Sequence, residues 1–537
     1  MDKFQFSPTA SNDIGALTQL CCGTDRVETT TDTIIPDTMG DVDKILLSYA
    51  TPRIDGYFIT ENGVEVEGTV DYHLLLSTEG NRLSSLTASE PFEAKIVCEE
   101  ISGDSKVLLL PILDYVKTKL VNPRKINLRS QTLLSYRIVA PRVTEPTLTG
   151  NETLSEEMNV QRKRIVYQGA AVHSVEEKGF NGAVDIELDS GAPSAEEVVS
   201  CHVTLTPVEI KTRGDEDNLR SEGVISMVYR TPEGNYFTTE KKISLDTPIT
   251  LPEGFGGNWH GYAVPHDVSS VLSVNEYGEM KMVEADFLYD LYLYFFANKE
   301  CSAVTDLYST EFETAINTTT KRMLTLKRCY STGLSVNASS AREDVGAENV
   351  RNVFMGNVHL RNVSLNTNEE QNKLVFLAEA EISLANENHA VTEEEALFSA
   401  CSFPYPVRCE LDIQERVTPE EMIVDYSISD IRCRADSGRL YCDFELLIRI
   451  LSTEATPLRY IDKAVLLHDK PLDIKRSPLT LCYPAENDTL WDVAKHYGVT
   501  SKDLCRANRL ETEDIAGKKV LLIPPSRDNK PIFEKVL

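Results

Sequence analysis

NGVEVEGTVDYHLLL, residues 62–76, alternates apolar with other side chains along most of its length. The apolar side chains that fall on one face of an extended chain are Val64, Val66, Val70, Tyr72, Leu74 and Leu76. A period of two residues predicts a β-strand with one buried face. A polar turn and a second strand-like stretch, STEGNRLSSLTASEPFEAKI (77–96), follow it and predict a hairpin.

The same order of features occurs twice more along the chain. The second copy is DNLRSEGVISMVYRTPEGNYFTTEKKISLDTPI (217–249), and the third is NKLVFLAEAEISLANENHAVTEEEALFSACSFPY (372–405). Gly68, Gly223 and Ala378 fall at matching places, about 155 residues apart. A repeat of this length is too long for a solenoid unit, so it predicts tandem domains that each bury a core.

Each copy continues with a strand, a polar turn and a long alternating strand, at residues 114–139, 270–295 and 426–451. The connectors upstream, such as SEEMNVQRKRIVYQGAAVHSVEE (155–177), have a mixed pattern that suggests partly helical structure. The predicted fold is mainly β, with three tandem β-rich domains followed by a small α+β domain. The open sheet edges of such domains need covering, and they could also pair in assembly. The predicted boundaries are 1–24 for an N-terminal segment, 25–145, 155–305 and 310–465 for the three domains, 479–524 for the small domain and 525–537 for a tail.

The charge of the chain restricts its partners. The 537 residues carry a formal net charge of -30. A surface this acidic repels nucleic-acid phosphates and anionic lipid headgroups, so neither is expected as the main partner. Simple solubility explains the charge, and a basic protein partner is the alternative.

Neither the N-terminus nor the cysteines indicate export. The opening MDKFQFSPTASNDIGALTQL lacks the continuous apolar stretch of a signal peptide. No run of about 18 apolar residues occurs, so no transmembrane helix is expected and the chain is predicted to be cytoplasmic. The twelve cysteines include no CxxC pair, which excludes the usual zinc spacing. Most are expected to be buried thiols, and the adjacent Cys21 and Cys22 could crosslink on oxidation.

Motifs for catalysis are absent from the sequence. There is no HExxH, no GxSxG and no GxxxxGK[ST]. GFGGNWHGY (254–262) is glycine-rich but is interpreted as a loop between hairpins. Asp37, Asp41 and Asp43 could bind a cation, but turn and helix-cap roles explain them better. The chain is therefore predicted not to be an enzyme, with no catalytic residue, metal ligand or cofactor.

The C-terminal stretch 479–524 is a complete small domain by its local signals. LTLCY (479–483) reads as a strand, and TLWD (489–492) starts a helix with a capping-box pattern. Gly498 ends that helix, TSKD (500–503) starts a second one, and VLLIP (520–524) closes the domain as a strand. The predicted order is therefore βααβ.

This stretch resembles a LysM domain, through DTLWDVAKHYGV, L..AN.L and the closing G.K.LIP pattern. The Pro-Gly-Asp turn common in the family is Glu486-Asn487-Asp488 here. The resemblance implies a shallow groove between the loop entering the first helix and the loop before the last strand. The expected partner- or glycan-binding residues are Asn487, Asp488, Thr489, Leu490, Trp491, Leu510, Asp514, Ile515 and Gly517. Trp491 is expected to be half exposed, either as a packing residue or as an aromatic anchor for a partner.

A second resemblance covers the first copy. TDTIIPDTMGDVDKILLSYATPRI (31–54), VEVEGTVDYHLLL (64–76) and NPRKINLRS (122–130) resemble the SPOCS domain of spore-coat proteins. The second and third copies keep the strand pattern but lose NPRKI. Three SPOCS-like domains before one LysM domain resemble the SipL type of clostridial spore coat morphogenetic protein.

That resemblance implies a scaffold rather than an enzyme. Such proteins assemble at the forespore surface from the mother-cell cytoplasm, and their LysM domain binds the coat ATPase that polymerises there. The alternative is a protein that binds peptidoglycan or another N-acetylglucosamine polymer of the cell wall or spore cortex.

Overall fold

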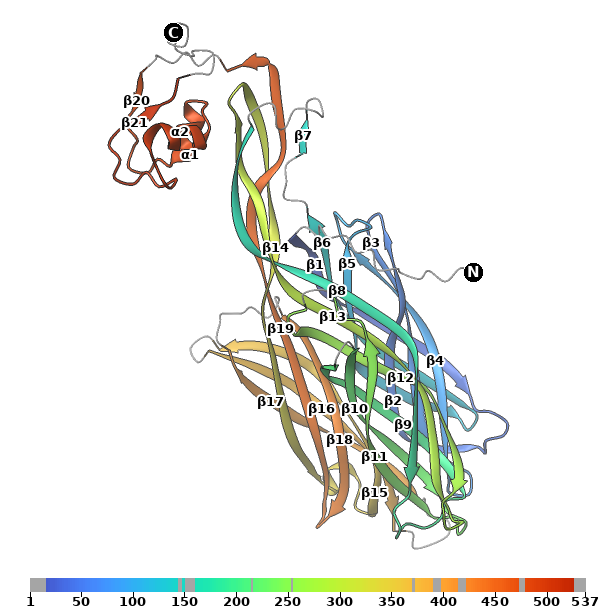
Figure 1. The fold of residues 1–537 in the computed structure, drawn as a ribbon. Helices are drawn as coiled ribbons and strands as arrows, with labels where there is room; N and C mark the ends of the chain where they lie inside the picture. The colour runs from blue at the N-terminus through green and yellow to red at the C-terminus, as the bar shows by residue number, and fades with distance from the viewer. Residues whose placement is uncertain are drawn as a thin grey trace.

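The computed structural model describes residues 16–142, 147–149, 160–213, 216–252, 255–368, 372–389, 397–413, 422–472 and 479–525. Long β-strands form almost all of the molecule, and two short helices lie near the C-terminus (Figure 1). The prediction of a mainly β chain that ends in a small βααβ domain is confirmed. In the described part of the chain, no helix is long and apolar enough to cross a membrane.

Six strands between residues 16 and 142, here called copy 1, make a three-stranded sheet that faces three neighbouring strands of a seven-stranded sheet. The strands are β1 (Ala16–Ile34), β2 (Val42–Thr60), β3 (Gly63–Thr78), β4 (Arg82–Val97), β5 (Lys106–Asn122) and β6 (Lys125–Arg142). One sheet has the order β2-β3-β4, and in the other β6 lies between β1 and β5. The alternating apolar residues of β3 are buried between the two sheets, as their period predicts.

The same arrangement recurs in copy 2 (160–309) and copy 3 (312–471). The strands of copy 2 are β8 (Val160–Glu187), β9 (Glu197–Arg213), β10 (Glu216–Arg230), β11 (Tyr236–Ile249), β12 (Asn258–Val274) and β13 (Met280–Ser309). Those of copy 3 are β14 (Phe312–Ala341), β15 (Val350–Asn368), β16 (Lys373–Asn388), β17 (Phe398–Asp412), β18 (Met422–Asp436) and β19 (Arg439–Pro471), with a short 3₁₀ helix η1 (Glu343–Val345). Sheets β11-β10-β9 and β12-β13-β8 in copy 2 match the sheet β15-β16-β17 and the strands β18-β19-β14 in copy 3. Strand β14 also pairs with β1, which joins strands of copies 1 and 3 in the seven-stranded sheet.

The structure corrects three details of the sequence-based prediction. The connector at 155–177 is not helical where it is described, because β8 begins at Val160 and runs through it. The order of apolar and charged residues in this segment is mixed because one side of the strand faces solvent. Strand β1 crosses the predicted boundary at residue 24, and β12 begins at Asn258 inside the predicted loop. Residues 1–15, Gly254 and nearly all of the predicted tail lie outside the described residues.

Gly68 and Gly223, the matching residues of the first two copies, are sterically required. A Cβ on Gly68 would lie 2.3 Å from the Phe92 ring and 2.6 Å from the backbone oxygen of Arg53. A Cβ on Gly223 would lie 1.9 Å from the backbone oxygen of Thr204. A bulge or irregularity in the neighbouring strand lies near each of them. The repeated small residue therefore marks a place where two strands approach closely.

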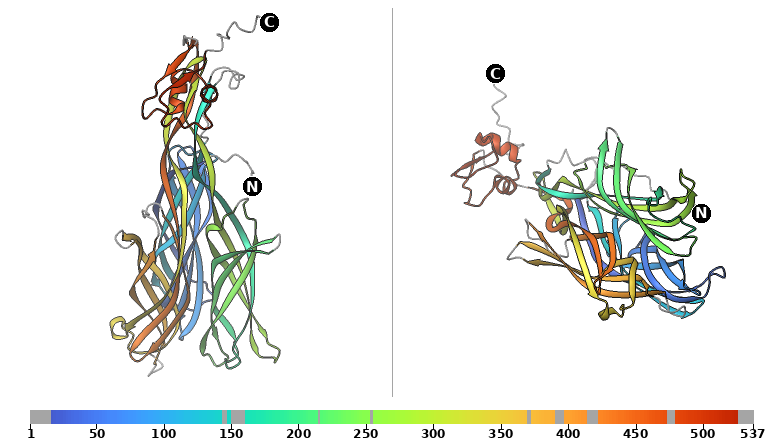
Figure 2. Two further views of the ribbon diagram at one scale, coloured as in Figure 1. Left: turned by 60° about the vertical axis from the view of Figure 1, so that its left-hand side comes forward. Right: turned by 90° about the horizontal axis from the view of Figure 1, so that it is seen from below.

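The three copies close into a ring around a common axis (Figure 2). Strand β4 contacts β9, β11 contacts β15, and β17 contacts β2, so each copy touches the next in the same way. Buried residues from all three copies meet in one cluster, made of Leu46, Leu47, Tyr49, Leu75, Leu83, Val199, Val228, Ala385 and Phe398. These sheet edges thus lie against neighbouring copies within the chain.

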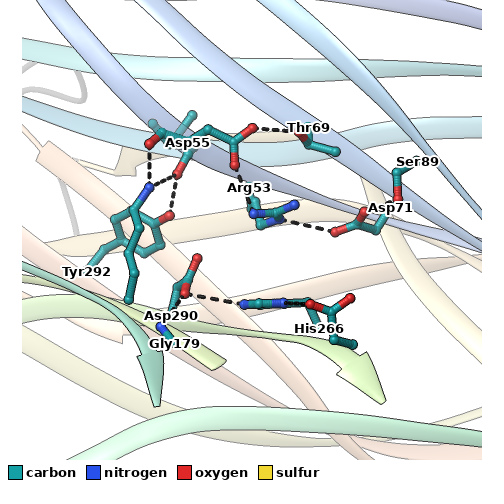
Figure 3. A network of polar contacts seen from close by, with 12 residues as sticks. Arg53, Asp55, Thr69, Asp71, Ser89, Gly179, His266, Asp290 and Tyr292 are labelled. Atoms are coloured by element: carbon teal, nitrogen blue, oxygen red, sulfur yellow. Dashed lines mark hydrogen bonds and ion pairs between the residues drawn. The ribbon is translucent and has the colours of Figure 1, made fainter. Parts of the chain in front are cut away.

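Copy 2 is held to copy 1 at a bulge in β2 (Figure 3). The register shifts between Ile54 and Gly56, and Asp55 is the extra residue. The Tyr292 hydroxyl donates a hydrogen bond to the backbone oxygen of Ile54. The Lys178 ammonium donates to the same oxygen at 3.1 Å and also to the backbone oxygen of Asp55. These bonds give partners to carbonyl groups beside the bulge.

Charged side chains complete this contact on both sides. Asp290 is 2% exposed and accepts hydrogen bonds from the backbone N–H of Gly179 at 2.9 Å and from His266 Nε2 at 3.3 Å. On the copy 1 side, Arg53 pairs with Asp71 at 3.2 Å and with Asp55. These contacts lie within each copy, and the bonds that cross from copy 2 to copy 1 are those of Tyr292 and Lys178.

The sequence motifs of copy 1 meet at one end of its sandwich. Arg124, from NPRKI, donates hydrogen bonds to the backbone oxygens of Met39 at 2.6 Å and Pro36 at 3.0 Å. It also pairs with Asp37 at 3.0 Å and Asp41 at 3.6 Å. Asp37 and Asp41 therefore lie beside the Arg124 guanidinium, and no group of three or more potential metal ligands occurs among the described residues.

Four strands extend beyond the ring as a narrow stalk (Figure 1). Strand β13 pairs with β8 from Met282 to Ser309, and β14 pairs with β19 along its length. The two pairs bury apolar residues between them, namely Ala303, Val304, Leu307, Met323, Tyr460, Ile461 and Ala464. A short strand, β7 (Thr147–Thr149), runs parallel to β19. The stalk carries the C-terminal domain away from the ring.

Candidate functional site

The C-terminal domain forms from local signals in its own sequence. Strand β20 (Thr480–Cys482) pairs antiparallel with β21 (Leu521–Ile523), and helices α1 (Leu490–His496) and α2 (Ser501–Asn508) lie between them in sequence. The Thr489 hydroxyl accepts from the Asp492 backbone N–H, and the Asp492 carboxylate accepts from the Thr489 N–H at 3.0 Å. This is the predicted capping box. The Thr489 hydrogen bonds also lower the pKa of Asp492.

Asn508 fixes the second helix to the closing strand. Its side-chain oxygen accepts from the Leu522 backbone N–H at 2.7 Å, and its side-chain nitrogen donates to the Leu522 oxygen at 2.8 Å. A third bond joins it to the Leu504 oxygen at 2.9 Å. The amide thus replaces a missing strand neighbour, which explains an asparagine at this place in the sequence.

The comparisons with known proteins identify this domain. The LysM domain family matches residues 485–524. The C-terminal domain is a LysM domain. Comparison of the chain with curated proteins and with solved structures gave no match.

The two loops predicted to form the LysM groove are exposed at their tips. Asn487, Asp488 and Thr489 in the first loop are exposed, as are Asp514 and Gly517 in the second. Both acids close turns: Asp488 accepts from the Ala485 N–H, and Asp514 from the Ala516 N–H, each at 2.8 Å. The first turn is therefore held by a carboxylate, and Asn487 does not adopt a positive φ.

The apolar residues among the predicted sites lie beneath these loops. Leu490 is 1% exposed, Ile515 is 6% exposed, and both belong to the core of the domain. Leu510 is half-buried at the edge of the same core. Gly517 has φ +80° in the turn before β21, a conformation that favours glycine. The core therefore joins the two loops, and their polar tips face solvent.

Trp491 occupies a different place from the one expected. It is 9% exposed, so the prediction of a half-exposed residue is wrong. Its indole Nε1–H donates to Asp306 Oδ2 on β13 at 2.7 Å, and its ring lies edge-on to Tyr308 with centroids 4.9 Å apart. Lys495, one helical turn further, pairs with the same carboxylate at 2.7 Å. The packing interpretation of Trp491 agrees with this position.

Further contacts make this an extensive junction between the LysM domain and the stalk. The Tyr308 hydroxyl donates to the Val499 backbone oxygen at 2.6 Å. Burial alone would raise the pKa of Asp306, but hydrogen bonds from Lys495 and Trp491 lower it below its usual value. Helix α1 therefore faces the stalk, and partners must approach the domain from another side.

One exposed apolar strip of the domain was missed by sequence reasoning. The strip consists of Leu479, Leu481 and Tyr483, which are 68%, 47% and 73% exposed. Val520, just before strand β21, is 39% exposed. The alternation in LTLCY is the sequence signal, because it puts the first, third and fifth side chains on one face of the strand. Nothing in the described residues covers this face.

Proposed function

We propose that this protein is a non-enzymatic scaffold that binds its partner through the LysM domain. The observation that carries the proposal is the position of that domain. It is fixed by Trp491 and Asp306 to the end of a stalk, while the loops around residues 487–489 and 514–517 remain exposed. A rigid body that holds a binding module at a distance suits assembly, because it sets where the partner lies.

The partner we propose is a coat ATPase that polymerises on the forespore surface, met from the mother-cell cytoplasm. The resemblance of residues 31–54, 64–76 and 122–130 to SPOCS domains supports this assignment. The contacts of Arg124 with Pro36 and Asp37 support it further, because they show that two separate motifs of that resemblance act together in the fold. The acidic chain, at -30, favours a protein partner over nucleic acid or a bare membrane.

A glycan is the second candidate partner, and the family match of residues 485–524 favours it. LysM domains bind N-acetylglucosamine polymers such as peptidoglycan in the groove between the same two loops. The exposed backbone and polar side chains of these loops are compatible with either partner.

The test uses the full chain, with purified peptidoglycan and purified coat ATPase offered separately. The blocking variant is Asn487→Arg, which puts a bulky charged side chain on an exposed loop tip. The matched control is Asn235→Arg, the same change in an exposed turn of copy 2. Binding to the ATPase that is lost in Asn487→Arg and kept in Asn235→Arg supports the scaffold.

Two other outcomes point elsewhere. Binding to peptidoglycan with the same dependence on Asn487, and none to the ATPase, would replace the scaffold with the glycan-binding function. ATPase binding that survives Asn487→Arg would move the contact from these loops to another face, such as the strip formed by Leu479, Leu481 and Tyr483.

A further inference from the structure

Two cysteines face each other across the β18–β19 hairpin of copy 3. Cys433 and Cys442 are register partners, and the hairpin turns through Ser437 and Gly438. Both turn residues have positive φ, at +48° and +78°, as a two-residue type I′ turn requires. Such a turn is flanked by a hydrogen-bonded pair of residues. From there, non-hydrogen-bonded and hydrogen-bonded pairs alternate along the hairpin.

Counting from the turn puts the cysteines in a favourable pair. Asp436 and Arg439 flank the turn, and the cysteines are the fourth pair along the register. They therefore occupy a non-hydrogen-bonded pair, in which Cα atoms are about 4.5 Å apart and side chains approach most closely. A disulfide needs Cα atoms about 4.4–6.8 Å apart, so the backbone can accept one without moving far.

Both side chains pack in the core between the two sheets of copy 3. Cys442 is 0% exposed and Cys433 packs against the same core. The sulfur of Cys433 lies over Gly356 in the facing sheet, where a Cβ would be only 2.3 Å from it. The neighbouring Cys442 thiol and burial raise the pKa of Cys433. Both thiols are free in the structure.

We propose that Cys433 and Cys442 are a redox modification site and form a cross-strand disulfide with a disulfide oxidant. With glutathione disulfide, Cys433, the less buried of the two thiols, loses its proton and attacks one glutathione sulfur, which releases the first glutathione. The Cys442 thiolate then attacks Cys433 Sγ and releases the second. The two cysteines lose two protons and two electrons in total, and the oxidant becomes two glutathione thiols.

This pair differs from the adjacent cysteines considered from sequence. Cys21 and Cys22 are consecutive on β1, so their side chains point to opposite faces of the sheet. A bond between Cys433 and Cys442 would instead fix the two strands of one hairpin. Since β19 continues into the stalk that carries the LysM domain, the bond would stabilise the base of that strand.

The test is to oxidise the full chain with glutathione disulfide at mildly alkaline pH, block remaining thiols, and digest without reduction. Trypsin cuts after Arg432, Arg434 and Arg439, so the two cysteines fall on separate peptides. We expect these peptides to appear as one linked species, with loss of thiol labelling at both positions. Reduction should separate them again.

Two variants accompany the wild-type chain. Cys442→Ser should abolish the linked species, whereas Cys409→Ser, a buried cysteine of the same core, should leave it unchanged. If Cys442→Ser fails to fold, the wild-type peptide map still decides. Labelling of both thiols after prolonged oxidation, or their linkage only to glutathione or to other cysteines, would overturn the proposal.

Discussion

Trp491 in the LysM domain donates a 2.7 Å hydrogen bond to Asp306 on strand β13, although 185 residues separate them in sequence. This bond, the Lys495 ion pair and the Tyr308 contact join a small domain to a long stalk. Its consequence is that helix α1 is not available to a partner while the domain is docked. The loops at 487–489 and 514–517 are left as the accessible part of the predicted groove.

Removing the Asp306 carboxylate should loosen this junction. Asp306→Ala leaves the buried indole N–H without an acceptor, at a cost of about 1–3 kcal/mol. We expect stronger acrylamide quenching of Trp491 fluorescence, measured in a Trp259→Phe background because the chain has two tryptophans. Asp462→Ala, an exposed acid on stalk strand β19, serves as the control and should leave quenching unchanged. Equal quenching in both variants would show that Asp306 does not hold the domain.

Gly68→Ala should destabilise the ring. The added Cβ would lie 2.3 Å from the Phe92 ring and 2.6 Å from the Arg53 oxygen, so strands or side chains must shift. Overpacking of this kind costs about 1–3 kcal/mol. The control is Gly56→Ala, since nothing lies within 4 Å of its added Cβ. Urea denaturation measures both, and a Gly68→Ala chain as stable as Gly56→Ala would contradict the steric argument.

Arg124→Lys should weaken copy 1 nearly as much as Arg124→Ala. The guanidinium bonds two backbone oxygens and Asp37 at once, and a single ammonium cannot reproduce that fork. We expect a loss of about 1–3 kcal/mol in the free energy of unfolding for either variant. Lys95→Ala, which breaks an exposed pair with Glu65, should change stability far less. Full stability of Arg124→Lys would mean that charge alone suffices at this turn.

Acid should destabilise the ring through two buried histidines. Burial lowers the pKa of His260 to about 4 and that of His202 to about 3. The unfolded chain binds these protons more readily, with a pKa of about 6.5, so the histidines lower stability as pH falls below that value. The contribution of the neutral histidines to stability is complete above about pH 6.5. As the pH falls from there toward the pKa in the folded state, each histidine lowers the free energy of unfolding by up to about 1.4 kcal/mol per pH unit.

The measurement is the urea midpoint of unfolding over a pH series. His260→Gln should reduce the dependence on pH, because the variant no longer gains a proton on unfolding. His496→Gln, which replaces an exposed histidine, should keep the wild-type dependence. Comparing slopes removes the shared effect of the net charge of -30. An unchanged slope in His260→Gln would rule out this histidine as a source of acid sensitivity.

Local patterns in the sequence were enough to predict several parts of the structure. The alternation in residues 62–76 indicates a buried face because side chains of a strand point to opposite sides in turn. The capping box of Thr489 and Asp492 could be predicted because its partners are three residues apart on one helical turn. The spacing of Gly68 and Gly223 marked the repeat because both positions meet the same steric limit.

Two predictions failed where neighbours come from far away. The described part of the predicted connector, residues 160–177, has a pattern unlike a strand because one side of β8 faces solvent. Trp491 was expected to be half exposed because the periodicity of α1 says nothing about β13. In both cases the structure depends on residues that are far apart in the sequence, so the pattern of one short segment cannot reveal it.

The sequence by itself determined the strands of the repeated hairpins, where the repeat falls and how the LysM helices begin, since these depend on side-chain period and on contacts a few residues apart. Only the tertiary structure decided that β17 returns to β2 to close a ring, that Arg124 meets Pro36, and that Asp306 receives Trp491. The physical reason is that these contacts join segments that lie far apart in the sequence. Their complementarity depends on shape and position in space, which no local periodicity encodes.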